Sequence, residues 1–230
     1  MRMRFCDDWL LLPQRFALHV PSATAVLADV HLGYSAARQR LGDAIPSRSV
    51  AEEMQPLMDA ARAHTIEKVV IAGDLFERGY DADIHQQLLD VLARHSIRFI
   101  GLVPGNHDRG LDKVAQMPIF ADGYDLAGWQ ILHGDQASTH AKTVSGHWHP
   151  ALRRHGRKFP CFLMRGTHLV LPAFSLDAAG VDVTSDRRWR DWKCCIIDGS
   201  VVRGPSPVVS SHANGNATDH GPRTTDSSHQ

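Results

Sequence analysis

Three apolar runs in the first half of the chain alternate with two segments that have helical periodicity. The runs are Thr24–Leu27, Lys68–Ala72 and Arg98–Val103. The first segment between them, residues 46–64, repeats its apolar side chains at helical spacing, and the second is capped by Asp83. Strands that alternate with helices are typical of a parallel sheet. We therefore predict an α/β core in which these three strands run in the same direction.

The chain outside this core predicts mostly β-structure. Residues 5–12 and 15–20 are apolar runs on either side of Pro13 and predict a hairpin, whereas residues 35–42 predict an irregular or partly helical loop. After residue 120, short apolar runs separated by turn residues predict further strands, and we expect those over 159–164, 167–171, 181–183 and 192–197 to be antiparallel. These runs are 124–126, 128–132, 143–145, 159–164, 167–171, 181–183 and 192–197.

The length of 230 residues suffices for one domain with a sizeable core and some additional chain. From Gly204 the composition shifts to small and polar residues, so we predict a domain over residues 1–203 and a disordered tail over residues 204–230. Lys+Arg and Asp+Glu number 25 each, which gives a formal charge of zero. This balance provides no overall positive field for nucleic acid, although a local basic patch is compatible with it.

The four cysteines, Cys6, Cys161, Cys194 and Cys195, form no C-x-x-C pair. Their spacing therefore indicates neither a thiolate zinc site nor a disulfide framework, and it suits a reducing cytosol. The sequence shows no signal peptide and no run of about 18 apolar residues. We expect a cytoplasmic protein without a membrane partner.

Short polar clusters follow five of the predicted strands, and each has a glycine in it or beside it. Glycine lets the backbone turn tightly, so that the neighbouring side chain can point into a shared site at the carboxyl end of a sheet. Carboxylate, imidazole and amide groups without thiolates suit divalent Mn, Fe, Zn or Co. Each cluster alone also fits an ordinary turn, but their joint occurrence favours a metal site. The clusters are Asp29-Val30-His31, Gly73-Asp74, Gly105-Asn106-His107-Asp108, His133-Gly134 and Gly146-His147-Trp148-His149.

Over residues 24–175 these clusters resemble the calcineurin-like metallophosphoesterase superfamily, whose pattern is D-x-H, G-D, G-N-H-D/E, H and G-H-x-H. The sequences around Asp29 and His107, with Pro172-Ala173-Phe174-Ser175, resemble the branch of small prokaryotic DNA-ligase-associated phosphoesterases. The resemblance implies an α/β fold of two facing mixed β-sheets flanked by helices, the αββα metallophosphoesterase sandwich. It places the metal site at the carboxyl ends of the central strands.

The resemblance also implies a pair of divalent metal ions. One ion would be bound by the first cluster together with the last histidine, the other by the amide and the two remaining histidines, and Asp74 would bridge the two. Mn²⁺ is the expected metal, with Fe, Zn, Co or Ni as alternatives. The implied metal ligands are Asp29, His31, Asp74, Asn106, His133, His147 and His149.

Three further residues receive catalytic roles from the resemblance. His107 matches the histidine that faces the leaving group, and Glu77 and Arg78 fall in a run that resembles G-D-x-x-D-R-G. In that motif an acidic residue orients the catalytic histidine and the arginine helps to hold phosphate. Here Glu77 replaces the aspartate, and its longer side chain leaves open the pairing with the catalytic histidine and, with it, the role of Arg78.

The activity implied is phosphoester hydrolysis by attack of a hydroxide that bridges the two metals. A phosphodiester substrate, such as DNA, RNA or a nucleotide, follows from the branch resemblance. A phosphomonoesterase or small-nucleotide hydrolase is the alternative enzyme. A non-catalytic metal-binding scaffold is less favoured, because scaffold relatives tend to lose metal ligands or the leaving-group histidine and this sequence retains them all.

Two features next to the last cluster have two interpretations each. Trp148 either packs beneath the site or stacks on a substrate base, and packing is favoured. A basic hairpin follows, and it is either a solvated turn, which is the default, or a contact to a nucleic-acid backbone. Its basic residues are Arg153, Arg154, Arg157 and Lys158.

Overall fold

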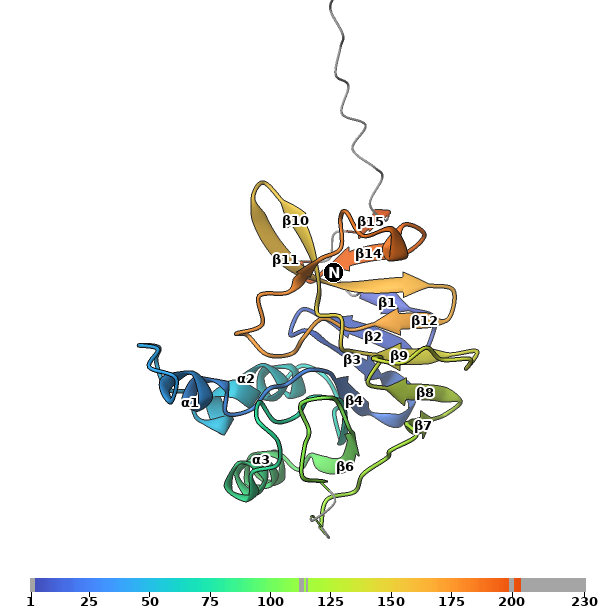
Figure 1. The fold of residues 1–230 in the computed structure, drawn as a ribbon. Coiled ribbons are helices and arrows are strands. Elements are labelled where there is room, and N and C mark those ends of the chain that lie inside the picture. Colours follow the sequence, from blue (N-terminus) through green and yellow to red (C-terminus); the bar gives the residue numbers. More distant parts are fainter. Residues whose placement is uncertain (1–2, 112–113, 115, 199–200, 204–230) are drawn as a thin grey trace, which may run out of the picture.

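The computed structural model describes residues 3–111, 114, 116–198 and 201–203, which form two β-sheets (Figure 1). In the first sheet the spatial order of the six strands is the order of the chain. β1 to β4 are antiparallel neighbours, whereas β4, β5 and β6 are parallel, as the alternation of strands and helices predicted. The strands are β1 Met3–Phe5, β2 Trp9–Leu12, β3 Phe16–His19, β4 Thr24–Leu27, β5 Lys68–Ala72 and β6 Arg98–Val103.

Three α-helices lie between these strands, namely α1 (Tyr34–Gln39), α2 (Val50–Ala61) and α3 (Ala82–Arg94). α2 and α3 bury their apolar faces in one cluster with side chains of β4, β5 and β6, so they cover the outer face of the first sheet.

The predicted starts of helices α2 and α3 were both wrong. α2 begins only after Ser49, which forms a capping box with Glu52. The cap of α3 is Asp81, not Asp83, because the Asp81 side chain accepts two backbone hydrogen bonds.

The second sheet follows after residue 120 and contains nine described strands. The prediction of antiparallel strands was wrong for two pairs, because β12 is parallel to β9 and β13 is parallel to β10. β8 and β9, for which no direction was predicted, are also parallel to each other. Apolar runs do not encode strand direction, and the connections here are long enough to cross over. β10 and β15 were not predicted as strands. The strands are β7 Tyr124–Leu126, β8 Trp129–Leu132, β9 Thr143–Ser145, β10 Pro150–Arg154, β11 Arg157–Arg165, β12 His168–Val170, β13 Val181–Asp182, β14 Lys193–Ile196 and β15 Val201–Arg203.

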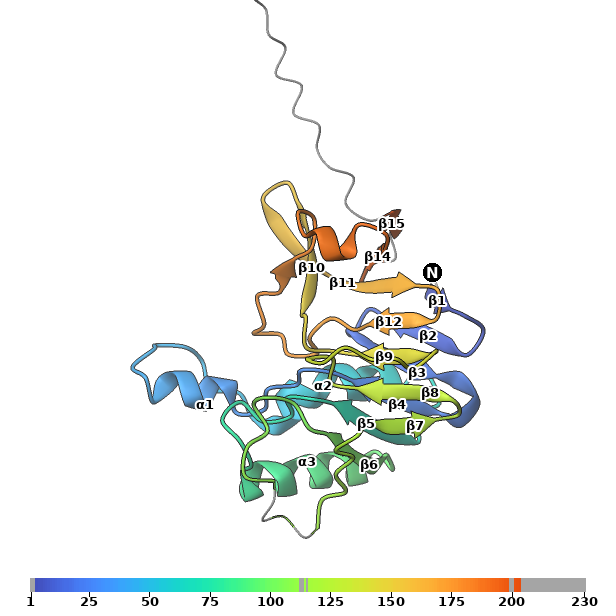
Figure 2. The ribbon, with the colours of Figure 1, turned by 45° about the vertical axis from the view of Figure 1, so that its right-hand side comes forward.

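The two sheets pack face to face across an apolar core that includes Trp9 and Trp129, whose ring centroids lie 5.7 Å apart. A separate cluster with Trp189 and Trp192 covers the other face of the second sheet, and it includes the 3₁₀-helix η3 (Arg187–Trp189). Figure 2 shows the β10–β11 hairpin projecting from this sheet. The expected pair of facing mixed sheets is confirmed. In the part of the chain that the structure describes, however, α-helices cover only the first sheet.

The predicted tail, residues 204–230, lies outside the described residues. Among the residues that are described, none of the helices has the length and apolar character needed to cross a membrane.

Glu53 in the first turn of α2 gives the fold a pH-dependent stability. Burial raises the pKa of Glu53 to about 7 from its ordinary 4.5, although the hydrogen bond donated by Gly33 N opposes the rise. A raised pKa in the folded state means that the stability from protonated Glu53 is present below pH 4.5 and lost as the pH rises through 7. We expect Glu53→Gln to raise the free energy of unfolding by about 1 kcal/mol at pH 8, after allowance for solvent screening.

The same variant should match the parent protein at pH 5, where Glu53 is mostly protonated. Urea unfolding at both pH values measures the difference, and Glu67→Gln, at an exposed position, is the control. A Glu53→Gln protein that is less stable than the parent at pH 8 would contradict this assignment.

Candidate functional site

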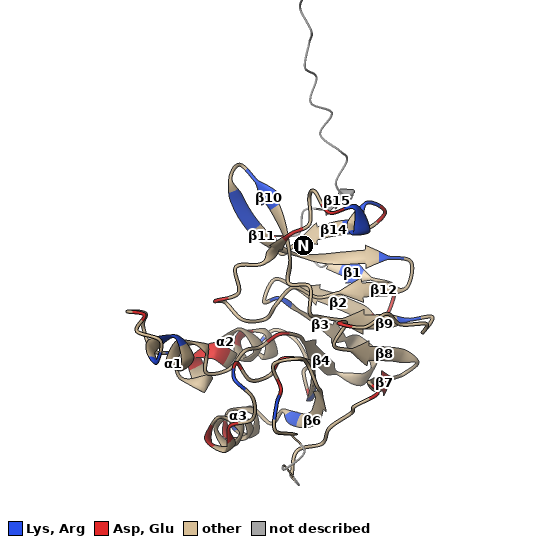
Figure 3. Ribbon diagram, in the orientation of Figure 1, with Lys and Arg blue, Asp and Glu red and all other residues tan. Residues whose placement is uncertain are grey.

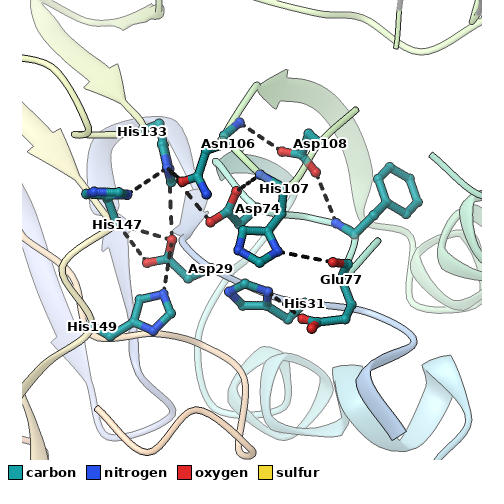
Figure 4. Close-up of polar contacts among 12 residues, drawn as sticks. Asp29, His31, Asp74, Glu77, Asn106, His107, Asp108, His133, His147 and His149 are labelled. Carbon is teal, nitrogen blue, oxygen red and sulfur yellow. Dashed lines mark hydrogen bonds and ion pairs between the residues drawn. The ribbon is translucent and has the colours of Figure 1, made fainter. Parts of the chain in front are cut away.

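All seven predicted metal ligands lie in loops at one edge of the sandwich (Figure 4). Asp29 and His31 follow β4, Asp74 follows β5 and Asn106 follows β6. These three strands are parallel, so their carboxyl ends lie at the same edge of the first sheet. The remaining histidines follow β8 and β9 of the second sheet, which are also parallel to each other. The parallel pairing of β8 and β9, which the apolar pattern does not predict, therefore brings His133, His147 and His149 to the site.

One half of the site is built around His133. Its Nε2 lies 3.1 Å from Asn106 Oδ1, 3.0 Å from His147 Nδ1 and 3.8 Å from Asp74 Oδ2. The backbone N–H of His147 donates to Asp29 Oδ2 at 2.8 Å, which ties the two sheets together at this point. Potential ligand atoms of Asp29, Asp74 and His133 all lie within 4.8 Å of one another. Five of the predicted ligands therefore surround one small volume, namely Asp29, Asp74, Asn106, His133 and His147.

The other half of the site is built around Asp29, which is fully buried. His149 Nε2 lies 3.5 Å from Asp29 Oδ1, and potential ligand atoms of Asp29, His31 and His149 also lie within 4.8 Å of one another. The ring centroids of His31 and His149 are 5.4 Å apart. This trio is the set that the sequence resemblance assigned to one metal ion.

Two ring nitrogens of the site, His31 Nε2 and His133 Nδ1, are buried and have no hydrogen-bond partner among the described residues. Leaving a buried polar atom unpaired costs about 1–3 kcal/mol, so such atoms usually have a function. An imidazole nitrogen beside two buried carboxylates is a suitable donor to a divalent cation. The residues present therefore fit a metal site.

The backbone of the site is strained in a way that points to function. Non-glycine residues rarely adopt positive φ, and each such residue costs roughly 1–3 kcal/mol. Hydrogen bonds hold the strained loops, for example from Asp29 N to Gly73 O at 3.1 Å and from His31 N to Asp74 O at 2.9 Å. The predicted ligands with φ between 43° and 71° are Asp29, His31, Asp74, His147 and His149.

The clusters contain glycine because neighbouring atoms leave no room for a Cβ at these positions. A Cβ on Gly105 would lie 2.2 Å from Asp74 Oδ1, and one on Gly146 would lie 2.4 Å from the Cβ of Ala28. Gly73 has a φ of +86°, and a Cβ there would lie 1.9 Å from His133 Nδ1. Any larger residue at these positions would push a predicted ligand out of place.

Burial and charge shift the pKa of three histidines in the site. Burial lowers the pKa of His31, and burial together with the neighbouring His133 lowers the pKa of His147. Burial acts in the same direction on His149, but the hydrogen bond and charge of Asp29 outweigh it and raise the pKa of His149. A lowered pKa keeps the imidazole neutral near pH 7, which is the form that binds metals.

The profile of the calcineurin-like phosphoesterase family matches residues 23–192 of the chain, a span that contains the entire site. The chain belongs to the calcineurin-like phosphoesterase family. It is therefore a metal-dependent phosphoester hydrolase, as the five clusters indicated.

The fold is also similar to a solved structure, the crystal structure of the nuclease MPE from Pseudomonas putida. The TM-score is 0.66 at 19% sequence identity, and the similarity covers 86% of this chain and 96% of the nuclease chain. At this identity the likeness concerns the fold. A comparison with curated proteins found no match.

A cavity of about 440 Å³ opens beside the metal-site residues of this phosphoesterase. His107 faces it between two exposed arginines, Arg78 and Arg109, and Asn106 and Glu77 complete the wall. The cavity therefore combines a predicted metal ligand, the predicted leaving-group histidine and two cationic side chains. An anionic ester is the class of molecule that such a wall would attract.

In the G-D-x-x-D-R-G motif the acidic side chain orients the catalytic histidine. The Glu77 side chain, however, forms no hydrogen bond with His107. Its carboxylate accepts a hydrogen bond from His31 Nδ1 at 3.0 Å, whereas His107 Nδ1 donates to the main-chain carbonyl of Glu77 at 3.1 Å. The longer side chain reaches past His107 to the predicted ligand (Figure 4). A carboxylate that fixes the ring of a metal-binding histidine is a common arrangement, and it leaves Nε2 to face the ion.

Sequence reasoning assigned no role to Asp108, whose buried carboxylate connects two loops of the site. It accepts hydrogen bonds from Phe76 N at 3.0 Å and from Gly105 N at 2.9 Å. Burial raises the pKa of Asp108 to about 6, against the effect of these backbone donors. Its position in the Gly105-Asn106-His107-Asp108 cluster was the signal that could have identified it.

We expect Glu77→Ala to weaken metal binding by roughly 10–100-fold, because His31 loses the carboxylate that orients its ring. Glu77→Gln keeps an acceptor oxygen and should lose less. The backbone carbonyl that contacts His107 remains in both variants, so kcat at saturating metal should fall far less than the affinity. Titration of the metal-free variants with Mn²⁺ measures the affinity. Unchanged affinity with a large loss of kcat would instead support the original role of Glu77 on His107.

Proposed function

We propose that the chain hydrolyses phosphodiesters with two divalent metal ions, of which Mn²⁺ is the first candidate. The observation that carries the proposal is the meeting of seven donor side chains from five loops, with two buried ring nitrogens left unpaired. Asp29, His31 and His149 would hold one ion and Asn106, His133 and His147 the other, with Asp74 between them. Two such ions would supply Lewis acidity toward the phosphoryl oxygens and activate a water nucleophile.

His107 would assist the leaving group in this reaction. Its Nδ1 donates to a carbonyl, which can only accept, so Nδ1 carries a proton. Nε2 can then donate a proton only when the ring is charged. Donation from Nε2 to the departing alkoxide would be general acid catalysis.

Arg78 and Arg109 would hold the anionic group of the substrate in the cavity. Both are exposed and lie on the same cavity wall as His107, so they can approach phosphate without displacing other side chains. Arginine suits this role because its guanidinium matches the geometry of phosphate oxygens. This proposal retains the sequence-based role of Arg78 and adds Arg109.

A diester is favoured over a monoester because the similar solved structure is a nuclease, and nucleases act on phosphodiester bonds. A phosphomonoesterase or small-nucleotide hydrolase is the second candidate. The test is a panel of bis(4-nitrophenyl) phosphate, 4-nitrophenyl phosphate and an oligonucleotide, with the metal-stripped protein supplied separately with Mn, Fe, Zn, Co and Ni. Faster hydrolysis of the diester supports the proposal. Faster hydrolysis of the monoester, or turnover of no ester with any metal, would overturn it.

A further inference from the structure

The chain carries an excess of positive charge beyond the last metal-site histidine. The segment of residues 150–193 contains nine Lys and Arg residues and four aspartates, although the whole chain is neutral. Figure 3 shows these basic residues on the β10–β11 hairpin and on the segment before β14. The hairpin begins one residue after His149, so this basic region is continuous with the site.

The tip of the hairpin presents two arginines on one face. Arg154 and Arg157 are directly opposite each other in the ladder, and alternation along the strands places them on the same face as Leu152 and Phe159. Leu152 and Phe159 belong to the cluster that covers the outer face of the second sheet. Among the described residues neither arginine has an acidic partner.

The basic side chains on the opposite face of the hairpin are held by contacts within the chain. Arg153 pairs with Asp182 at 2.9 Å, and Lys158 Nζ donates to the carbonyl of Gly180 at 2.8 Å. Arg154 and Arg157 thus differ from Arg153 and Lys158, because no hydrogen bond or ion pair within the described residues holds their guanidinium groups.

A stacked pair connects this face with the metal-site residues. The guanidinium of Arg188 lies 4.2 Å from the centroid of the Trp148 ring, and Trp148 itself contacts the ring of His147 at 5.1 Å. Asp186 holds Arg188 by its Nε and Nη2, which fixes the guanidinium plane over the indole. Trp189 packs edge-on against Trp148 from behind. Trp148 thus packs against Trp189, as predicted. The guanidinium of Arg188, which is exposed, lies over the Trp148 ring and provides a flat surface on which a base can stack.

The distances suit an extended strand of nucleic acid. β10 runs four residue steps from Pro150 to Arg154, which is about 13 Å at the usual strand rise. A strand whose scissile phosphate lies at the metal site would pass Arg188 first and would reach Arg154 and Arg157 within a few nucleotides. Planar guanidinium and aromatic groups stack on unpaired bases, whereas arginines without acidic partners bind phosphates.

We propose that Arg188 on Trp148, together with Arg154 and Arg157, binds single-stranded nucleic acid and guides it into the metal site. We refer to these four residues as the strand-binding face. The proposal rests on the proposed function for the metal site and adds the class of its substrate. A single strand is favoured over a duplex because the bases of a duplex already stack on one another.

The first experiment measures the affinity of this face for a fluorescent 20-nucleotide oligothymidine by anisotropy. The full chain is used with Mn²⁺ and with His107→Ala, which prevents cleavage during the measurement. We expect Arg154→Ala/Arg157→Ala to weaken binding about tenfold at low salt and to reduce the slope of log Kobs against log[salt] by about 1.4, the value for two lost phosphate contacts.

The matched control is Arg94→Ala/Arg98→Ala, which removes the same charge from exposed positions on α3 and β6. Equal affinities of the two double variants would overturn the proposal. Arg188→Lys retains the charge but removes the plane, and we expect it to weaken binding about fivefold. A duplex of the same length that binds as tightly as the single strand would overturn the assignment to single strands.

The second experiment separates this proposal from the proposed function. In the parent background, Arg154→Ala/Arg157→Ala should lower kcat/KM on the oligonucleotide about tenfold, mainly through a higher KM. Hydrolysis of bis(4-nitrophenyl) phosphate should stay within about twofold of the parent rate, because that diester is too small to span the distance to the hairpin. If the parent hydrolyses the small diester but the double variant cleaves the oligonucleotide normally, only the strand-binding face fails. If the parent hydrolyses no ester with any metal, the proposed function fails.

Discussion

His107→Ala should retain its metal ions and lose most of its turnover. The link between this residue and the metal site is its backbone N–H, which donates to Asp74 Oδ1 at 2.8 Å and is unaffected by the substitution. The imidazole itself faces the substrate cavity. A general acid contributes typically about 10²–10⁴-fold, so we expect kcat on a diester with an alkyl leaving group to fall by that factor and kcat on bis(4-nitrophenyl) phosphate to fall less.

The measurement combines elemental analysis with steady-state kinetics on the same preparation. His140→Ala, at an exposed position in the loop between β8 and β9, is the control and should behave as the parent protein. A leaving group of low pKa requires little protonation, so the loss should be larger for an alkyl ester than for a nitrophenyl ester. Full activity of His107→Ala on both esters would remove His107 from the mechanism.

Asp74→Asn should lose both metal ions and all metal-dependent activity. The Asp74 carboxylate is almost completely buried, and its two oxygens face different parts of the site: Oδ1 accepts from His107 N, and Oδ2 lies 3.8 Å from His133 Nε2. A neutral amide offsets too little of the charge of two dications held about 3.5–4 Å apart. An amide NH₂ in place of Oδ1 would also meet the backbone N–H of His107, and two donors cannot form a hydrogen bond.

Elemental analysis of Asp74→Asn after loading with Mn²⁺ tests this expectation. Asp135→Asn removes a carboxylate from an exposed position two residues after His133 and should retain the parent stoichiometry. Circular dichroism distinguishes loss of metal from loss of the fold. Two retained ions in a folded Asp74→Asn protein would contradict the bridging role of Asp74.

The sequence located the three parallel strands of the first sheet accurately because their ends are chemically marked, whereas the predicted strand over residues 5–12 is divided between β1 and β2. β4, β5 and β6 are apolar runs that stop at polar clusters with glycine, and their predicted and observed limits coincide. The convergence of the predicted ligands followed from the same feature, since parallel strands end at one edge. Helix starts were less certain, because several polar residues precede α2 and only Ser49 completes the capping box with Glu52.

Contacts between distant residues were beyond the sequence. The parallel pairing of β8 and β9 depends on packing against the first sheet, and their apolar pattern does not express it. The partner of Glu77 depends on one extra methylene group relative to aspartate and on the position of His31, 46 residues earlier. Arg188 lies 40 residues after Trp148, and no local pattern relates the two.

The division of the site between the two sheets has a consequence for biosynthesis. A nascent chain that has emerged as far as the loop after β6 already contains Asp29, His31, Asp74 and Asn106, but it lacks the histidines that follow β8 and β9. Such a chain contains the residues of the first sheet and its helices, yet it cannot complete either proposed set of donors. With the proposed ligands, high-affinity capture of metal would require the second sheet to have docked first.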